Sequence, residues 1–187
     1  LVRTICRSRT YQLSANPVDG NKDDSRYFSH AVSKLLTAEQ MLDAICQATE
    51  VQEKYPGLPA GTRATQLPDG EVNNQFLKTF GQPARELACE CERESDSNLA
   101  QALQLINGPT INDKLKAQNN RLGRLIAGKK SDKEILAELY LSTLSRLPTA
   151  EDEKIALAHL AKAKESRKAW EDIHWALMNT KEFLFRH

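Results

Sequence analysis

The chain has 187 residues, a length that suits one domain or one domain with an appended subdomain. Hydrophobic residues make up 40% and aromatic residues only 6%, and Ala, Leu, Lys and Glu are frequent, which favours helices packed through aliphatic stripes over a sheet sandwich. Lys and Arg number 26 against 25 Asp and Glu, so the chain lacks the basic excess of a nucleic-acid-binding protein. We therefore expect no nucleic-acid partner. The chain also has no apolar run of transmembrane length.

Two helices are expected in the first part of the chain, at residues 1–8 and from residue 37 onwards. The first places Val2, Ile5 and Cys6 on one face, and a polar loop follows through about residue 26. A capping box marks the start of the second helix, because Thr37 is followed three residues later by Gln. The stripe of this second helix consists of Ala38, Met41, Leu42, Ile45, Cys46 and Thr49.

A long irregular loop is expected at 54–82, where Pro and Gly recur and the helical period disappears. A short extended piece is possible at 62–67. Loops of this length inside a domain are uncommon, and they are either functional or held by their own contacts.

The second half of the chain has clearer helical signals. Capping residues, Gly stops and apolar periodicity predict helices at 98–107, 111–127, from Ser131, from Thr149 to about 166, and near the C-terminus, where Thr180 caps a final turn. The residues expected to point inward are Leu99, Ala102, Leu103 and Ile106 in the first of these, Ile135, Leu136, Leu139, Tyr140, Thr143 and Leu144 in the third, and Trp170, Ile173, His174, Leu177 and Met178 in the last long one.

These elements predict an all-α fold, an irregular bundle of six to seven helices with one long Pro/Gly-rich loop and little or no sheet. We expect a single helical domain over 1–187, with a looser, loop-rich half at 1–97 and a compact helical half at 98–187. Because the chain starts at Leu1 without a methionine, we expect it to be a fragment of a longer chain.

The four cysteines fall into two kinds of surroundings. Cys6 and Cys46 lie on apolar stripes, where they act as buried small hydrophobes or, in an oxidising compartment, form a disulfide. Cys89 and Cys91 have acidic neighbours, which raise a thiol pKa and disfavour a reactive thiolate. Structural thiols, a strained disulfide, or a metal site completed by further ligands remain open for this pair.

No catalytic signature is present. The chain has no haem attachment motif, no Gly-x-Ser-x-Gly elbow and no Gly-rich phosphate loop. The helical spacing of His174 from Trp170 and Met178 favours a partly buried, hydrogen-bonded ring over a base or ligand.

Eight stretches of the chain are informative when they are taken together: Ser8–Ser14, Leu36–Ile45, Gly57–Ala64, Phe80–Pro83, Cys89–Arg93, Leu99–Gly108, Glu138–Thr149 and Trp175–Leu184. In collinear order and over nearly the whole chain, they resemble a known family, the C-terminal domain of unknown function in the planctomycete cytochrome-c-associated proteins.

The resemblance implies where the protein is found and which domains accompany it, rather than a reaction. It implies an exported or envelope-associated protein whose upstream domains, a c-type cytochrome-like module among them, are partners of this chain. It implies no cofactor in this chain, and no reaction that can be assigned to its residues. A link to polysaccharide is inferred for such proteins by association only.

Three functions follow as hypotheses, and a non-catalytic role is favoured over an enzyme. The first is a non-catalytic structural or interaction domain that binds through the Pro/Gly loop or a terminal Trp/Phe surface. The second is part of an extracellular carbohydrate-processing enzyme, with Arg63, Gln66, Asp69 and Glu90 or Glu92 lining a cleft. The third, weaker one is a dithiol redox or metal site at Cys89 and Cys91. The candidates for a functional surface are Arg63, Gln66, Cys89, Glu90, Cys91, Glu92 and Arg93. We also expect segment Cys89–Arg93 to act as a structural joint between the two halves.

Overall fold

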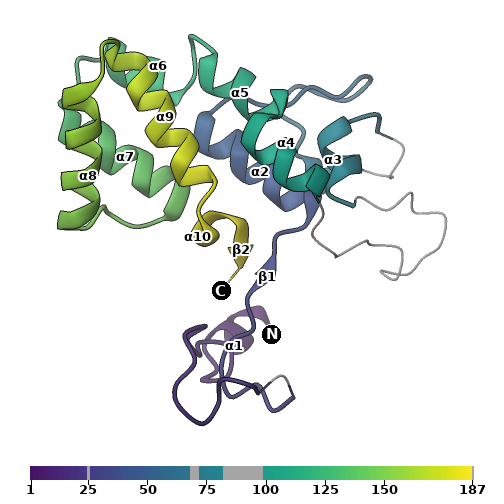
Figure 1. Cartoon of the computed structure of the whole chain (residues 1–187). Coiled ribbons are helices and arrows are strands. Elements are labelled where there is room, and N and C mark those ends of the chain that lie inside the picture. Colours follow the sequence, from purple (N-terminus) through teal and green to yellow (C-terminus); the bar gives the residue numbers. More distant parts are fainter. Residues whose placement is uncertain (25, 68–71, 82–98, 187) are drawn as a thin grey trace.

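A computed structural model describes residues 1–24, 26–67, 72–81 and 99–186, and within these ranges the protein is mainly helical (Figure 1). Seven helices of the described residues are seven residues long or more, and the only strands found there are two residues each. The predicted all-α class is therefore confirmed. The elements are α1 (Val2–Cys6), β1 (Lys34–Leu35), α2 (Ala38–Thr49), the 3-10 turn η1 (Ala64–Gln66), α3 (Gln75–Thr79), α4 (Leu99–Asn107), α5 (Pro109–Lys116), α6 (Arg121–Ala127), α7 (Asp132–Leu144), α8 (Ala150–Lys162), α9 (Ser166–Met178), α10 (Lys181–Leu184) and β2 (Phe185–Arg186).

Helix α2 is central to the packing. Its predicted capping box is present, since the Thr37 side chain accepts from the backbone N–H of Gln40 and the Gln40 side chain accepts from the Thr37 N–H. Met41, Leu42 and Ile45 are fully buried, and each such side chain contributes roughly 1.5–3 kcal/mol on transfer from water. The helix contacts η1, α3, α5, α6 and α7.

Two groups of buried side chains form the core. The first surrounds α2 and includes Phe76 of α3, Ile111 of α5 and Met178 of α9. The second fills the space between α6, α7, α8 and α9, and Trp170 is one of its largest members. Leu144, at the end of α7, packs against both groups, so the two cores are continuous.

The stripes predicted for α7 and α9 are largely correct. All the residues expected to point inward are buried, except Leu144 and Ile173, which are half-buried. Thr180 caps α10 as predicted, because its hydroxyl accepts from the N–H of Phe183. Since Trp170 and Phe183 are both buried, however, the expected terminal Trp/Phe surface is mostly part of the core.

One predicted helix, at 111–127, is in fact two. Helix α5 ends at Lys116 and α6 begins at Arg121, because the fully buried Asn120 caps the break. Its side-chain oxygen accepts from the Gly123 N–H at 2.8 Å, and its amide donates to the carbonyl of Leu115 at 2.6 Å. The break is thus fixed by a buried amide rather than by a Gly or Pro.

The predicted inward face of α4 is wrong. Leu103 and Ile106 are exposed, and Ala102 is exposed too, whereas Gln101 and Leu105 are buried. The side-chain amide of Gln101 donates to the carbonyl of Thr79, which ends α3, so α4 packs against α3 through the face that carries Gln101. Leu99 belongs to α4, but its side chain is not among those described.

Within the long loop, two short elements replace the expected irregular or extended chain. Residues 64–66 form the 3-10 turn η1 rather than an extended piece, and α3 follows at 75–79. Asn74 caps α3 by accepting from the Leu77 N–H, and the rings of Phe76 and Phe80 stack at 4.4 Å between centroids. A helix this short is stable because both rings are buried. The sequence did not predict it, since five residues are too few to show a helical period.

Residues 1–33 lie apart from the helical body and connect to it through β1 (Figure 1). β1 pairs antiparallel with β2, with Lys34 opposite Arg186 and Leu35 opposite Phe185. The N–H of Leu36 extends this pairing by donating to the carbonyl of Leu184 at 3.0 Å. The strand that follows residues 1–33 and the C-terminal strand therefore meet at one small joint.

Candidate functional site

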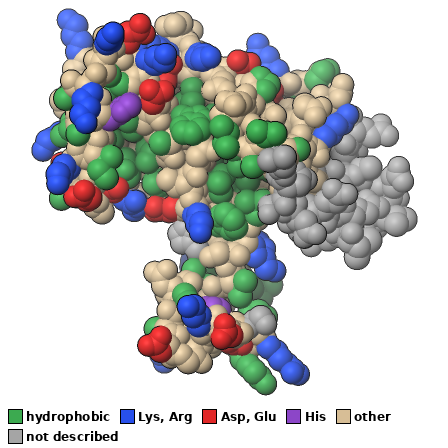
Figure 2. All heavy atoms as spheres, in the orientation of Figure 1, with side chains coloured by type: hydrophobic (Ala, Val, Ile, Leu, Met, Phe, Trp, Pro, Cys, Tyr) green, Lys and Arg blue, Asp and Glu red, His purple; other side chains and the backbone are tan. Residues whose placement is uncertain are grey.

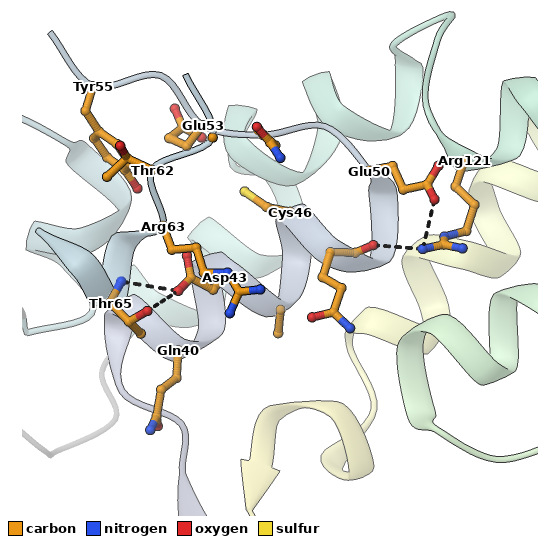
Figure 3. A pocket seen from close by; sticks show the side chains of 14 residues that line it. Gln40, Asp43, Cys46, Glu50, Glu53, Tyr55, Thr62, Arg63, Thr65 and Arg121 are labelled. Carbon is orange, nitrogen blue, oxygen red and sulfur yellow. Dashed lines mark hydrogen bonds and ion pairs between the residues drawn. The ribbon is translucent and has the colours of Figure 1, made fainter. Parts of the chain in front are cut away.

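A polar cleft of about 680 Å³ opens beside α2 (Figure 3). One wall is the polar side of α2, the second is the loop that follows it, and Arg121 of α6 closes one end. The side chains that line this cleft are Gln40, Asp43, Ala44, Cys46, Gln47, Glu50, Gln52, Glu53, Tyr55, Thr62, Arg63, Thr65 and Arg121, together with Gly61.

Asp43 holds the loop wall of the cleft against α2. Its carboxylate accepts from the backbone N–H groups of Ala64 at 2.7 Å and Thr65 at 3.2 Å, and from the Thr65 hydroxyl at 2.7 Å. Figure 3 shows this carboxylate directed at the start of η1. Asp43 thus acts as the cap of a turn more than twenty residues further along the chain.

Arg121 holds the other end of the cleft. Its guanidinium donates to the carbonyls of Ala48 at 2.9 Å and Gln47 at 3.1 Å, which α2 leaves without helical partners. It also forms ion pairs with Glu50 at 3.2 Å and Glu138 at 2.6 Å. Glu50, which adopts the left-handed conformation at the end of α2, pairs with Arg124 as well.

Lys114 and Glu53 form a partly buried pair behind the cleft. The Lys114 ammonium lies 2.9 Å from the Glu53 carboxylate and donates to the carbonyl of Val51 at 3.0 Å. Burial raises the pKa of the neighbouring Cys46 thiol, although the positive charge of Lys114 opposes that rise. Cys46 is therefore a protonated thiol at neutral pH rather than a nucleophilic thiolate.

Several polar groups in the cleft have no partner among the described residues. Tyr55 is 7% exposed, and its hydroxyl is buried without a hydrogen bond, an arrangement that costs about 1–3 kcal/mol. Burial, with the charge of Glu53 as the next cause, raises the pKa of this hydroxyl well above its ordinary value. The guanidinium of Arg63 is exposed and forms no ion pair within the described part of the chain.

Gly61 lets the loop close over the cleft. Its φ of +88° is one that L side chains rarely adopt. A Cβ at this position would also lie 3.2 Å from the side-chain oxygen of Gln52.

The predicted surface residues separate in the structure. Arg63 lines the cleft, whereas Gln66 does not. The side-chain oxygen of Gln66 accepts from the backbone N–H of Arg63 at 3.0 Å and so stabilises the η1 turn. Segment Cys89–Arg93 and Asp69 lie outside the described residues, so their place relative to this cleft stays a prediction.

The sequence reasoning missed most of the cleft. Gln40, Asp43, Gln47 and Glu50 recur every three or four residues opposite the apolar stripe of α2, and this spacing was a usable signal. Nothing in the local sequence places Arg121 beside them.

The prediction for Cys6 is wrong, since this thiol is exposed on α1, while Cys46 is half-buried. Both are free cysteines, and no disulfide joins them. Helix α1 buries none of its residues, so its apolar face does not pack into the core that the described residues form. No group of three His, Cys, Asp or Glu side chains suited to a metal ion occurs within the ranges that the structure describes.

His174 also differs from its prediction. It is fully buried, and neither ring nitrogen has a hydrogen-bond partner in the described part of the chain. Burial, with a smaller contribution from the charge of Arg121, lowers the pKa of His174 to about 4. The ring is therefore neutral at physiological pH and is not the hydrogen-bonded side chain that was expected.

A second unusual region is the apolar surface of the N-terminal segment. Eight large hydrophobic side chains of residues 1–33 are exposed, and none of the buried hydrophobic core residues precedes Ala38. Figure 2 shows this segment below the helical body, with hydrophobic and charged side chains mixed on its surface. The N-terminal apolar surface comprises Leu1, Val2, Ile5, Tyr11, Val18, Tyr27, Phe28 and Val32.

The aromatic pair of this surface is carried on a turn that Asp24 organises. The Asp24 carboxylate accepts from the N–H groups of Arg26 at 2.9 Å, Tyr27 at 2.7 Å and Ser29 at 2.9 Å, and from the Ser29 hydroxyl at 2.5 Å. The Ser29 hydroxyl and these N–H groups hold the pKa of Asp24 well below its usual range. Phe28 has a φ of +53°, an uncommon conformation for a bulky residue. The turn thus carries two exposed aromatic rings, those of Tyr27 and Phe28.

Together, the fold and the cleft define an all-α domain with a polar surface site. The chain belongs to the family PSD1, Protein of unknown function (DUF1553), whose model matches residues 1–160. No curated protein and no solved structure matches the chain. None of the helices in the described ranges combines the length and apolar character that a membrane crossing needs.

Proposed function

We propose that the chain is a non-catalytic interaction module that docks through its N-terminal apolar surface onto a further domain of the same polypeptide. The observation that carries the proposal is the exposure of this surface. Tyr27 is 79% exposed, Val2 74% and Phe28 64%, although single domains bury most side chains of these types. A covering surface would remove this apolar area from water.

The charges around the apolar residues indicate the chemistry of the partner surface. Residues 1–34 contain six Lys and Arg but three Asp, and one of the acids, Asp24, is engaged by its own turn. The matching surface is therefore an apolar patch with acidic residues at its rim.

The carbohydrate-processing alternative has less support in the described cleft. Glycoside hydrolysis generally uses a pair of carboxyl groups that face the substrate. Here Asp43 caps η1, Glu50 pairs with Arg121, and Glu53 pairs with Lys114. The dithiol or metal hypothesis for Cys89 and Cys91 concerns residues outside the described ranges and stays a prediction.

The setting of the module is also part of this proposal. The resemblance described above supports an exported or envelope-associated protein of planctomycete type with cytochrome-c-like modules elsewhere in its chain. In the same way, we propose that this chain binds no cofactor of its own.

Hydroxyl-radical footprinting tests the docking. The chain is expressed alone and as the full product of its gene, and oxidation of Tyr11, Tyr27 and Phe28 is compared between the two. Docking removes these rings from solvent, so we expect their oxidation to fall several-fold in the full product. Ile155, which is 62% exposed on α8, serves as the internal control and keeps its reactivity. Equal oxidation of Tyr27 and Phe28 in both samples would show the proposal to be wrong.

The double variant Tyr27→Ser with Phe28→Ser gives the second arm. Both side chains are exposed, so the variant should unfold at the same urea concentration as the parent when the chain is alone. In the full product, the oxidation of Tyr11 should return towards its value in the isolated chain. Continued protection of Tyr11 in this variant would contradict a role for the aromatic pair.

A further inference from the structure

Among the residues that the structure describes, the polar cleft beside α2 has one unpaired charged side chain, that of Arg63. Its three acids are held by hydrogen bonds or ion pairs, and Arg121 is held by Glu50, Glu138 and two backbone carbonyls. Arg63 lines the same cleft, and its guanidinium has no ion pair with any residue that the structure describes. The cleft is therefore suited to a ligand with one anionic group.

The neutral side chains of the cleft suit hydroxyl groups. The side-chain amides of Gln47 and Gln52 form no hydrogen bonds within the described ranges, and an amide offers both donors and acceptors. A ligand hydroxyl also donates and accepts, so the two groups match. The lining has few apolar side chains, which disfavours a peptide that needs subsites for apolar residues.

Tyr55 supplies an independent indication of a ligand. Its hydroxyl is buried, unpartnered among the described residues, and part of the cleft wall. Figure 3 shows its side chain directed along the loop wall towards Thr62 and Arg63. A polar ligand seated beside Arg63 would bring a hydrogen-bonding group towards this hydroxyl after a small shift of the rim.

We propose that the polar cleft binds a small hydroxylated carboxylate, which is the chemistry of a sugar acid. Arg63 pairs with the carboxylate, Gln47 and Gln52 bind the hydroxyl groups, and Tyr55 closes the inner wall. The volume of about 680 Å³ lies in the range of sites that hold small ligands, roughly 300–1,000 Å³. This site is separate from the N-terminal apolar surface, so neither proposal depends on the other.

An NMR titration of the whole chain tests the site with four probes of known structure. Glucuronate carries both features, glucose only the hydroxyl groups, acetate only the carboxylate, and triglycine a peptide carboxylate. We expect saturable shifts of the backbone amides of Gln47, Gln52 and Arg63 with glucuronate. Glucose and acetate should each bind about tenfold more weakly than glucuronate. Glucose lacks the carboxylate that pairs with Arg63, and acetate lacks the hydroxyl groups that bind Gln47 and Gln52.

Variants assign the roles of the side chains. Arg63→Gln should weaken glucuronate binding about tenfold and leave glucose binding unchanged, because only the ion pair is lost. Tyr55→Phe, which removes one hydroxyl and keeps the ring, should weaken both sugars about threefold. Arg9→Gln is the matched control, since Arg9 is an exposed arginine outside the cleft, and it should bind glucuronate like the parent.

Three results would overturn the proposal. They are the absence of saturable shifts with glucuronate in the folded parent chain, unchanged glucuronate binding by Arg63→Gln, and binding of triglycine as tightly as glucuronate. The last result would assign the cleft to peptide carboxylates instead.

Discussion

At the scale of single residues, His174 is a buried polar side chain that the fold keeps neutral. Its neighbours on α9, Trp170 and Met178, place it on the inward stripe, and the sequence pattern correctly indicated that face. The pattern could not reveal how completely the ring is enclosed, because burial depends on the helices that pack against α9. Burial of an imidazole without partners favours its uncharged form.

His174 therefore makes the stability of the protein depend on pH. The unfolded chain takes up a proton near the ordinary pKa of 6.5, whereas the folded chain does so only near the lowered pKa of about 4. The free energy of unfolding is therefore unaffected by protonation of this ring above pH 6.5 and decreases as the pH falls from 6.5 towards 4, by up to roughly 3 kcal/mol. Urea unfolding between pH 7 and pH 4 measures this loss.

The variant His174→Leu isolates the contribution of the ring. It should match or exceed the parent in stability at pH 7, because it removes two unpartnered polar atoms from the core. Its free energy of unfolding should fall less on acidification, by up to roughly 3 kcal/mol. His159→Gln, at a half-exposed position on α8, is the control and should retain the parent's dependence. An equally steep acid dependence in His174→Leu would rule out this residue as the cause.

At the scale of helices and loops, the sequence correctly predicted features that depend on neighbouring residues. It did not predict features that depend on tertiary contacts. The capping boxes of Thr37 with Gln40 and Ser131 with Glu134 are both present, because a cap depends on residues three apart in the sequence. The break at Asn120 was missed because its buried amide bonds the end of α5 and the start of α6 at once, and no sequence pattern reveals that burial. The inward face of α4 was missed because Gln101 binds the end of α3.

The candidate site shows the same division. Arg63 was identified because it lies in a loop rich in Gly and Pro, and it does line the cleft. The polar side of α2 could have been derived from helical spacing. The roles of Asp43 and Arg121 depend on contacts between segments far apart in sequence, for which a single sequence has no pattern.

Arg121 is expected to stabilise the end of α2 more than an exposed arginine would. Its side chain is 16% exposed, and it satisfies two helix-terminal carbonyls as well as two carboxylates. Lysine cannot reproduce this planar set of donors. We expect Arg121→Lys to lower the free energy of unfolding by about 2 kcal/mol, measured by urea denaturation.

Arg124→Lys is the matched control on the same helix. The Arg124 side chain is 63% exposed and pairs with Glu50, so its replacement should change stability by less than about 1 kcal/mol. If the two variants were equally stable, the backbone contacts of Arg121 would not matter for α2.

At the scale of the whole molecule, the chain combines a helical body with an N-terminal segment whose large hydrophobic side chains are mostly exposed. The body has two core groups joined at Leu144. Residues 1–33 contribute to neither of these groups and are joined to the body by β1 and β2, which form a two-residue pairing. Apolar burial is the main stabilising contribution in folding, so the two parts should differ greatly in local stability.

Hydrogen exchange measures this difference directly. In the isolated chain, we expect amides of residues 1–33 to open at a cost below about 2 kcal/mol, whereas the slowest amides of α2 and α7 exchange only on global unfolding, at roughly 5–15 kcal/mol. In the full gene product, docking of the N-terminal apolar surface should raise the protection of residues 1–33 and leave that of α2 unchanged. The opposite result is that residues 1–33 are protected as strongly as α2 in the isolated chain. That result would mean that the segment is stable without a covering surface, and it would contradict the docking explanation for the exposure of Tyr27 and Phe28.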